Sequence, residues 1–217
     1  MATYESDLSN EAVGTTDLPA PTLDSATGGA RVVDLSWTLN DTNADGTITI
    51  RRDGITVATI GDLSQTTYTD TGAGLDGTAY AYDLVRDTGD ATATSNTETG
   101  TTDLPAPTDL THPATGDESV DYAWTANHNT GETRLEYRES DMDTWQVFGT
   151  VPFDSDTETV TGLLNGEGYE SRVVAVTDDA ETVGDVDAFQ TTLPDEDQPV
   201  LGNGVEDEVA VDRESAP

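Results

Sequence analysis

The sequence predicts an all-β protein made of two tandem β-sandwiches, and three observations support this prediction. Residues 15–22 recur letter for letter at 101–108, an offset of 86 residues, and a fixed period of this length marks a repeated small domain. Apolar residues alternate with polar ones in many short segments, which is the pattern of strands with one buried face. None of these segments shows the 3.6-residue period of an amphipathic helix. The chain of 217 residues is long enough for two such domains.

The repeated peptide, Thr-Thr-Asp-Leu-Pro-Ala-Pro-Thr, is interpreted as the joint between the domains. Its prolines fix φ and lack a backbone N–H, so the peptide can neither continue a helix nor lie inside a central strand. A shortened copy at 191–194 ends the second repeat. The predicted organisation is an N-terminal extension at 1–16, a first domain at 17–102, a second domain at 103–192 and an acidic C-terminal tail at 193–217.

In the first domain, the strands can be predicted in order along the chain. The first clear strand carries the alternating apolar residues Val33, Leu35, Trp37 and Leu39. Two further strands are expected at 47–52 and 55–60, because the Asp53 and Gly54 pair between them favours a two-residue hairpin turn. The remaining expected strands are a short one around Tyr68, a longer one within 75–84 and a polar one near 91–100.

The second domain repeats this plan, and its landmarks stay in step with those of the first. Trp37 and Trp124 are 87 residues apart, and Tyr80 and Tyr169 are 89 residues apart. The alternating residues of its expected strands are Val120, Tyr122 and Trp124, then Leu135 and Tyr137, then Trp145, Val147 and Val151, then Val160, and finally Ser171, Val173 and Ala175. The two domains are therefore expected to share one fold.

Both domains resemble the fibronectin type III module. Each has a tryptophan on an early strand and, later, the pattern Leu-x-Gly-x-x-Tyr at 75–80 and at 164–169. The resemblance implies that Tyr80 and Tyr169 form tyrosine corners, in which the hydroxyl bonds to nearby backbone, and that the structural residues Trp37 and Trp124 lie in the cores. The absence of cysteine fits a sandwich without the immunoglobulin disulfide. The resemblance covers residues 18–192 and implies a fold rather than a function.

The two ends of the chain give separate predictions. Residues 9–16 align with 95–102, the last part of the first domain. A lone final strand has no sheet of its own, so one hypothesis is that it pairs with the sheet edge of a neighbouring chain; the alternative is a frayed leader. The tail at 193–217 is by itself expected to be a disordered acidic segment.

Charge is the strongest feature of the composition. The chain has 44 acidic residues, eight arginines and no lysine, for a formal net charge of −36. This composition resembles that of halophilic archaea that accumulate salt, because molar salt shortens the Debye length to about 3 Å and screens the self-repulsion. An acidic disordered chain is the alternative, and the regular apolar alternation disfavours it. No basic patch is present to meet phosphates, so nucleic acid is not an expected partner.

The same survey limits the other classes of protein. Without cysteine there is no disulfide framework and no thiol chemistry. No stretch approaches the 18 consecutive apolar residues of a membrane-spanning helix, so membrane insertion is not expected. The first residues show no signal-peptide pattern. We therefore expect a salt-adapted protein that is made in the cytoplasm.

One stretch resembles a metal site. Asp41, Asn43 and Asp45, followed by Gly46, place oxygen ligands at alternating positions, as at the start of a calcium loop. The twelfth position, where such a loop needs a bidentate glutamate, is Arg52, and the segment leads into a strand rather than a helix. The alternative is a turn that joins two strands of the sandwich. Calcium is thus the one cofactor that the sequence suggests, and both interpretations stay open.

No catalytic constellation is evident. Acidic pairs occur on expected loops at 141–143 and 154–156, and in a chain with 44 carboxylates such pairs arise by chance. His112 and His128 are separate in the sequence and are not expected to form a metal site or a catalytic triad. The protein is therefore not expected to be an enzyme.

The predicted function is structural. The first hypothesis is a surface-exposed virion component (capsid decoration, turret, fibre or tail protein) of a tailed virus infecting halophilic archaea. Modules of the resembled type are common on virus exteriors, and a virion protein leaves the cell by lysis without an export signal. The expected partners are further copies of the chain, other virion proteins, and a host surface receptor or glycan. The alternatives are a haloarchaeal cell-surface or adhesion module, which a glycan on Asn40 would favour, and the spacer of an extracellular enzyme.

Overall fold

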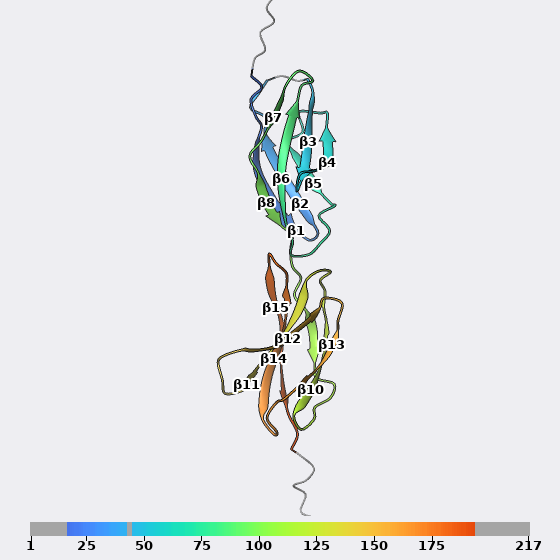
Figure 1. The fold of residues 1–217 in the computed structure, drawn as a ribbon, viewed down its shortest axis with the longest axis vertical. Helices are drawn as coiled ribbons and strands as arrows, with labels where there is room; N and C mark the ends of the chain where they lie inside the picture. Colours follow the sequence, from blue (N-terminus) through green and yellow to red (C-terminus); the bar gives the residue numbers. More distant parts are fainter. Residues whose placement is uncertain (1–16, 43–44, 194–217) are drawn as a thin grey trace, which may run out of the picture.

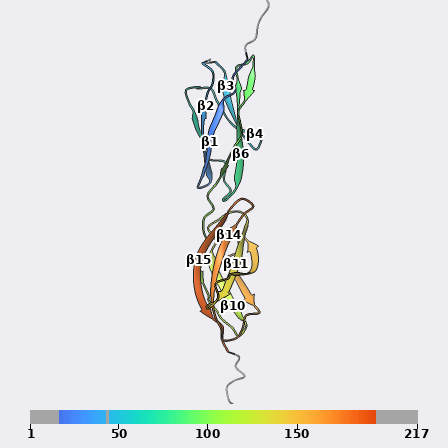
Figure 2. The ribbon, with the colours of Figure 1, turned by 90° about the vertical axis from the view of Figure 1, so that its left-hand side faces the viewer.

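The computed structural model describes residues 17–42 and 45–193, and these form two β-sandwiches joined end to end along the long axis of the molecule (Figure 1). Every regular element in this part of the chain is a strand. The predicted N-terminal strand addition, Asn43 of the predicted calcium loop and nearly all of the acidic tail lie outside the described residues. The view turned by 90° again shows one unit following the other (Figure 2).

Domain 1 contains two antiparallel sheets. Its strands are β1 (Thr22–Gly29), β2 (Val32–Thr38), β3 (Thr47–Arg52), β4 (Ile55–Ile60), β5 (Thr67–Asp70), β6 (Ala79–Asp87), β7 (Thr92–Thr94) and β8 (Glu98–Thr101). One sheet has the order β1-β2-β5, and the other has the order β4-β3-β6, with β7 and β8 both paired to β6. The hairpin between β3 and β4 turns at Asp53 and Gly54, which both have positive φ, as a primed two-residue turn requires.

Domain 2 repeats this architecture. Its strands are β9 (Thr108–Thr111), β10 (Ser119–Thr125), β11 (Glu132–Glu139), β12 (Gln146–Pro152), β13 (Thr157–Thr161), β14 (Gly168–Val176) and β15 (Glu181–Gln190). The sheets have the orders β13-β10-β9 and β12-β11-β14-β15. The equivalence of the two domains therefore extends from the repeated peptide to the strand pairing.

Each domain has its own apolar core between its sheets. The first contains Leu23, Val33, Leu35, Trp37, Ile48, Ile50, Ile60, Ala73, Tyr80, Tyr82 and Leu84. The second contains Leu110, Val120, Tyr122, Trp124, Leu135, Val160, Leu163, Tyr169, Val173 and Phe189. Both tryptophans and both corner tyrosines of the repeat are thus buried, and they come from equivalent strands.

The structure differs from the sequence-based expectation at three strands that gave no clear pattern, β1, β9 and β15. In β1 only Leu23 is fully buried, and β15 lies at a sheet edge where Val183 and Val186 stay exposed, so apolar alternation is weak. Residues 75–78 are also not part of a strand; they form the loop before β6. The polar strand expected near 91–100 is divided into β7 and β8.

Candidate functional site

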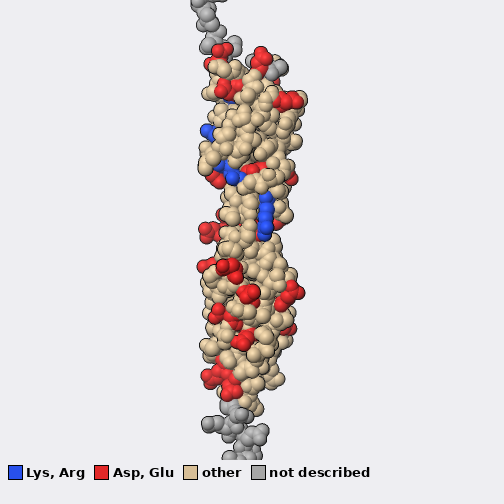
Figure 3. Space-filling view, turned by 90° about the vertical axis from the view of Figure 1, so that its right-hand side faces the viewer, with Lys and Arg blue, Asp and Glu red and all other residues tan. Residues whose placement is uncertain are grey.

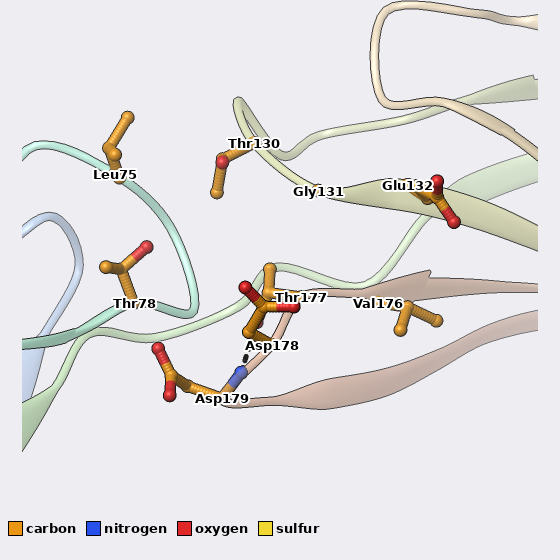
Figure 4. Close-up of a pocket in the computed structure, with 9 residues that line it drawn as sticks. All are labelled: Leu75, Thr78, Thr130, Gly131, Glu132, Val176, Thr177, Asp178 and Asp179. Carbon is orange, nitrogen blue, oxygen red and sulfur yellow. Dashed lines mark hydrogen bonds between the residues drawn. The ribbon is translucent and has the colours of Figure 1, made fainter.

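The joint between the domains is the most elaborate polar site of the described chain. Figure 4 shows Leu75 and Thr78 of domain 1 facing the loops that precede β11 and follow β14 in domain 2. An open cleft of about 510 Å³ lies between them. Its lining consists of Leu75, Thr78, Thr130, Gly131, Glu132, Val176, Thr177, Asp178 and Asp179.

Two direct hydrogen bonds join the edges of this cleft. The hydroxyl of Thr177 donates to the carbonyl of Gly77 at 2.6 Å. The backbone N–H of Ala79 donates to Asp179 Oδ2 at 2.9 Å. One bond therefore runs from domain 2 to domain 1 and the other in the reverse direction, which fixes the facing loops relative to one another.

Asp76 is the centre of the joint, and it is only 1% exposed. Its carboxylate accepts two hydrogen bonds from Arg31, both 2.9 Å, and a third from the backbone N–H of Asn129 at 3.0 Å. The Asn129 side chain in turn accepts from the Asp76 backbone and donates to the Gly74 carbonyl. The hydrogen bonds to Asp76 and its negative charge raise the pKa of Arg31 above the usual value of an arginine. A buried carboxylate needs several hydrogen-bond donors. The donors to Asp76 come from both domains, so Asp76 links an arginine of domain 1 to a loop of domain 2.

The repeated peptide packs against the same loop. Gly77 has a φ of 56°, and a Cβ atom on it would lie 3.0 Å from the Leu104 side chain. Leu104, from the second copy of the repeated peptide, is 8% exposed. The glycine therefore allows both the left-handed turn and the close approach of the leucine.

The cleft lining supplies carboxylates and threonine hydroxyls as its polar side chains, without a histidine, cysteine, lysine or arginine. The geometry of the joint is suited to holding two domains in a fixed orientation.

The predicted calcium ligands are only partly described. Asp41 is paired with Arg86, whose Nε lies 3.2 Å from Asp41 Oδ2, and Arg86 also donates to the carbonyls of Asp45 and Asp87 at 2.6 and 3.1 Å. The Arg86 side chain is completely buried, so it supplies the positive charge that a cation would bring. This pairing favours the interpretation as a structural turn. Calcium binding stays a prediction, and a calorimetric titration with calcium in high salt that shows no heat would dismiss it.

His112, for which the sequence predicts no partner, lies between two polar side chains in the structure. Its Nδ1 is 3.1 Å from Asp187 Oδ2 and its Nε2 is 2.8 Å from Ser171 Oγ. This Asp–His–Ser order resembles a catalytic triad, but Ser171 is completely buried, so a substrate carbonyl cannot reach its hydroxyl. Burial also lowers the pKa of His112, against the opposing effect of Asp187. The three residues come from β14, β15 and the segment after β9, a proximity that only the fold creates.

The remaining sites discussed from the sequence do not converge. The acidic pairs Asp141 with Asp143 and Asp154 with Asp156 are exposed, as solvated loop residues are. His128 is buried, and its Nδ1 lies 2.6 Å from the Ala126 carbonyl. Among the residues that the structure describes, no group of three or more histidine, aspartate or glutamate side chains could hold a metal ion.

The corner tyrosines differ between the domains. Tyr169 accepts a hydrogen bond at its hydroxyl from the Leu164 backbone at 2.9 Å, which is the geometry of a tyrosine corner. In domain 1, the ring of Tyr80 lies 5.2 Å below the guanidinium of Arg52. The buried hydroxyl in that region belongs instead to Tyr82, which donates to Asp70.

All seven arginines between residues 17 and 193 form ion pairs with carboxylates. The pairs are Arg31–Asp76, Arg51–Asp83, Arg52–Asp70, Arg86–Asp41, Arg134–Glu136, Arg134–Glu181, Arg138–Glu170 and Arg172–Glu136. Arg138 and Arg172 also stack on the ring of Trp145, at 4.7 and 4.4 Å from its centroid. The few positive charges therefore serve internal contacts, and acidic side chains are scattered over both domains on the face shown in Figure 3.

Comparison with known proteins identifies the fold. No protein-family profile matches the sequence, and no curated protein matches it. Among solved structures, a segment of two fibronectin type III domains from chicken tenascin matches with a TM-score of 0.64 and 18% identity, covering 80% of this chain and 99% of that one. The fold is two tandem fibronectin type III domains.

Other solved structures match less completely. A fibronectin type III domain of human collagen XX is 21% identical, with a TM-score of 0.37, and covers 41% of this chain and 92% of that domain. A segment of titin is 14% identical, with a TM-score of 0.41, and covers 78% of this chain and 63% of that segment. At the identity of the tenascin segment the likeness concerns the fold alone. No helix that could span a membrane occurs in the described ranges.

Proposed function

We propose that the protein is a non-enzymatic structural module that acts as a stiff spacer, on the exterior of a tailed virus infecting halophilic archaea. The observation that supports the spacer role best is the hydrogen-bonded joint around Asp76, which is 1% exposed and contacts both domains. A flexible linker between domains would not need a buried charge with donors from both sides. The joint therefore holds the two fibronectin type III domains as one elongated body.

The charge distribution supports use in concentrated salt. The described arginines form ion pairs with carboxylates of the same chain, so they leave little unpaired positive charge on the surface. The full sequence carries a formal net charge of −36. Such a surface is self-repelling in dilute buffer and is screened in molar salt. A spacer on a particle that is released into brine meets these conditions.

Within this proposal, the protein is a capsid decoration, turret, fibre or tail component, and its partners are further copies, other virion proteins, and a receptor or glycan on the host. Peptide mass spectrometry on density-purified particles and on the envelope of the uninfected host tests this assignment. We expect the peptides in the particles at tens to hundreds of copies per particle, as for a repeated structural subunit, and not in the envelope.

Peptides confined to the envelope would contradict the virion assignment and favour a cell-surface or adhesion module. A glycan on Asn40 would favour that alternative. The side-chain nitrogen of Asn40 already donates to the Ala20 carbonyl and to the Thr22 hydroxyl, at 2.7 and 3.0 Å. A glycan on this nitrogen would disturb the contacts that hold the first repeated peptide, so the structure gives no support to glycosylation at this position.

A further inference from the structure

The joint is built from two halves. The first half is the loop and peptide at the end of domain 1, and the second half is the set of loops that domain 2 presents to it. A copy of parts of the second half is present at the outer end of domain 1, the end away from the joint. In domain 2 this half includes the turn 177–180, in which Thr177 bonds through its backbone and hydroxyl to Ala180. In domain 1 the turn 88–91 makes the same set of bonds between Thr88 and Ala91. Asp90 then occupies the position of Asp179, the acceptor for the Ala79 amide across the joint.

The repeated peptide is also held in the same way at both places. Asn127 donates to the carbonyl of Ala106 and the hydroxyl of Thr108, just as Asn40 donates to the equivalent atoms of the first copy of the peptide. The outer end of domain 1 therefore repeats two of the features that domain 2 presents to domain 1, the threonine turn and the bound peptide. The loop from Asn40 to Gly46 differs, because it is two residues longer than the loop from Asn127 to Gly131.

The first half of the joint is repeated at the outer end of domain 2. Thr102 donates to the Leu75 carbonyl at 2.6 Å, and Thr191 donates to the Leu164 carbonyl at 2.5 Å. The following residues match as well, because Gly77 and Gly166 both have positive φ and both pack against a leucine of the repeated peptide. Asn165 is the equivalent of Asp76 in this second loop.

Two features show that the described residues leave this copy of the first half uncovered. Leu104 and Leu193 pack on the equivalent glycines, yet Leu104 is 8% exposed and Leu193 is 68% exposed. The difference arises because domain 2 covers the first leucine. In addition, the side-chain oxygen of Asn165 is buried and has no hydrogen-bond partner within the described ranges, whereas Asp76 accepts an amide from the next domain. A buried acceptor without a donor is costly, and docking of a further domain end would supply the donor.

We propose that the outer end of domain 2 binds the outer end of domain 1 of a second copy of this chain, through the contacts that already join the two domains within one chain. Such a contact is head to tail, so repeated association extends a row of molecules or closes a ring. Both ends carry acidic residues, among them Asp90 on one and Asp117 and Glu118 beside Asn165 on the other. The association is therefore weak in dilute buffer and strengthens in molar salt. It does not depend on the virion assignment.

Because an end-to-end contact is small, it belongs with weak interfaces, and chemical cross-linking is the suitable test. The chain has no cysteine, so single introduced cysteines react without background. Leu75 and Glu132 line opposite sides of the joint cleft, and their equivalents at the two outer ends are Leu164 and Thr47. The Glu132→Cys, Leu75→Cys double variant is the control, which a bis-maleimide with a long flexible spacer should cross-link within one chain.

A mixture of the two single variants Thr47→Cys and Leu164→Cys, in about 3 M salt where repulsion is screened, should give a cross-linked dimer. A mixture of Thr47→Cys with Val147→Cys is the matched negative control, since Val147 is 58% exposed on β12, away from both ends. Equal dimer yields from the two mixtures would overturn the proposal.

Sedimentation velocity provides a second readout on the unmodified chain. In high salt, the mean sedimentation coefficient should rise with protein concentration, and Leu193→Glu should abolish the rise because it places a charge in the contact. Val147→Glu should leave the rise unchanged. A chain that stays monomeric over the whole concentration range, or association that survives Leu193→Glu, would refute head-to-tail docking.

Discussion

Each sandwich buries a few polar side chains among its apolar core residues, and several of them have specific hydrogen-bond partners. Arg86 in domain 1 and His112 in domain 2 illustrate two ways in which a basic side chain is buried. Arg86 keeps its charge through Asp41 and two carbonyls, whereas burial favours the neutral form of His112. The second arrangement makes the stability of domain 2 dependent on pH.

The pKa of His112 is lowered in the folded protein below its usual value of 6.5, so the unfolded chain binds a proton at a higher pH than the native state does. The free energy of unfolding should therefore fall as the pH decreases below 6.5, by up to about 1.4 kcal/mol per pH unit until the folded pKa is reached. His112→Phe, which retains an aromatic ring beside Tyr122 and Phe189, should remove this component. Denaturant unfolding between pH 7.5 and 5 in high salt measures it, and parallel pH profiles for the two proteins would show that His112 does not contribute.

Gly28 lies where the first strand of domain 1, β1, packs closely against its last strand, β8. A Cβ atom at this position would lie 1.7 Å from the Thr101 carbonyl oxygen, on the neighbouring β8. Gly28→Ala should therefore destabilise domain 1 by about 2 kcal/mol or more, since the backbone must move. Gly61→Ala, where a Cβ would meet no atom within 4 Å, is the matched control. Chemical denaturation with a similar midpoint for both variants would contradict the close packing of β1 and β8.

At the level of the elements, the joint has the clearest consequence. Asp76→Ala removes the acceptor for Arg31 and for the Asn129 amide. We expect a loss of about 2–3 kcal/mol in the stability of domain 1, the usual range for hydrogen bonds to a charged group, and a wider range of angles between the domains. Small-angle X-ray scattering should show a shorter mean end-to-end distance. Asp141→Ala, on the exposed loop between β11 and β12, should change neither quantity.

For the whole molecule, electrostatic self-repulsion determines how the stability depends on salt. The full chain carries a formal net charge of −36, and the Debye length falls from about 10 Å at 0.1 M salt to about 3 Å at 1 M. The melting temperature should therefore rise substantially between about 0.1 and about 3 M sodium chloride. Calorimetric scans at the two salt concentrations measure the change. Equal melting temperatures would contradict salt adaptation.

The sequence predicted the fold well where strands have one buried face. The alternation at Val33, Leu35 and Trp37 and the hairpin at Asp53 and Gly54 are both local signals, and the structure contains the corresponding strands. Edge strands such as β15 carry no such alternation because both of their faces are partly exposed. The local sequence therefore does not predict them.

The joint could be located from the sequence but its contacts could not be derived. The repeated peptide marks where the domains meet, because a duplicated domain repeats its boundary. That Asp76 would bind an asparagine 53 residues later, or that His112 would meet Asp187, depends on pairs that are distant in the chain.

The sequence by itself determined the two-domain organisation, the strand-rich fold and the acidic, salt-dependent character, since repeats, alternation and charge are properties of the chain. Only the tertiary structure decided which of the carboxylates are buried and paired, and which domain ends stay uncovered. The physical reason is that burial and pairing depend on side chains brought together from distant strands and loops. The local pattern of a sequence does not indicate which of these distant side chains will meet.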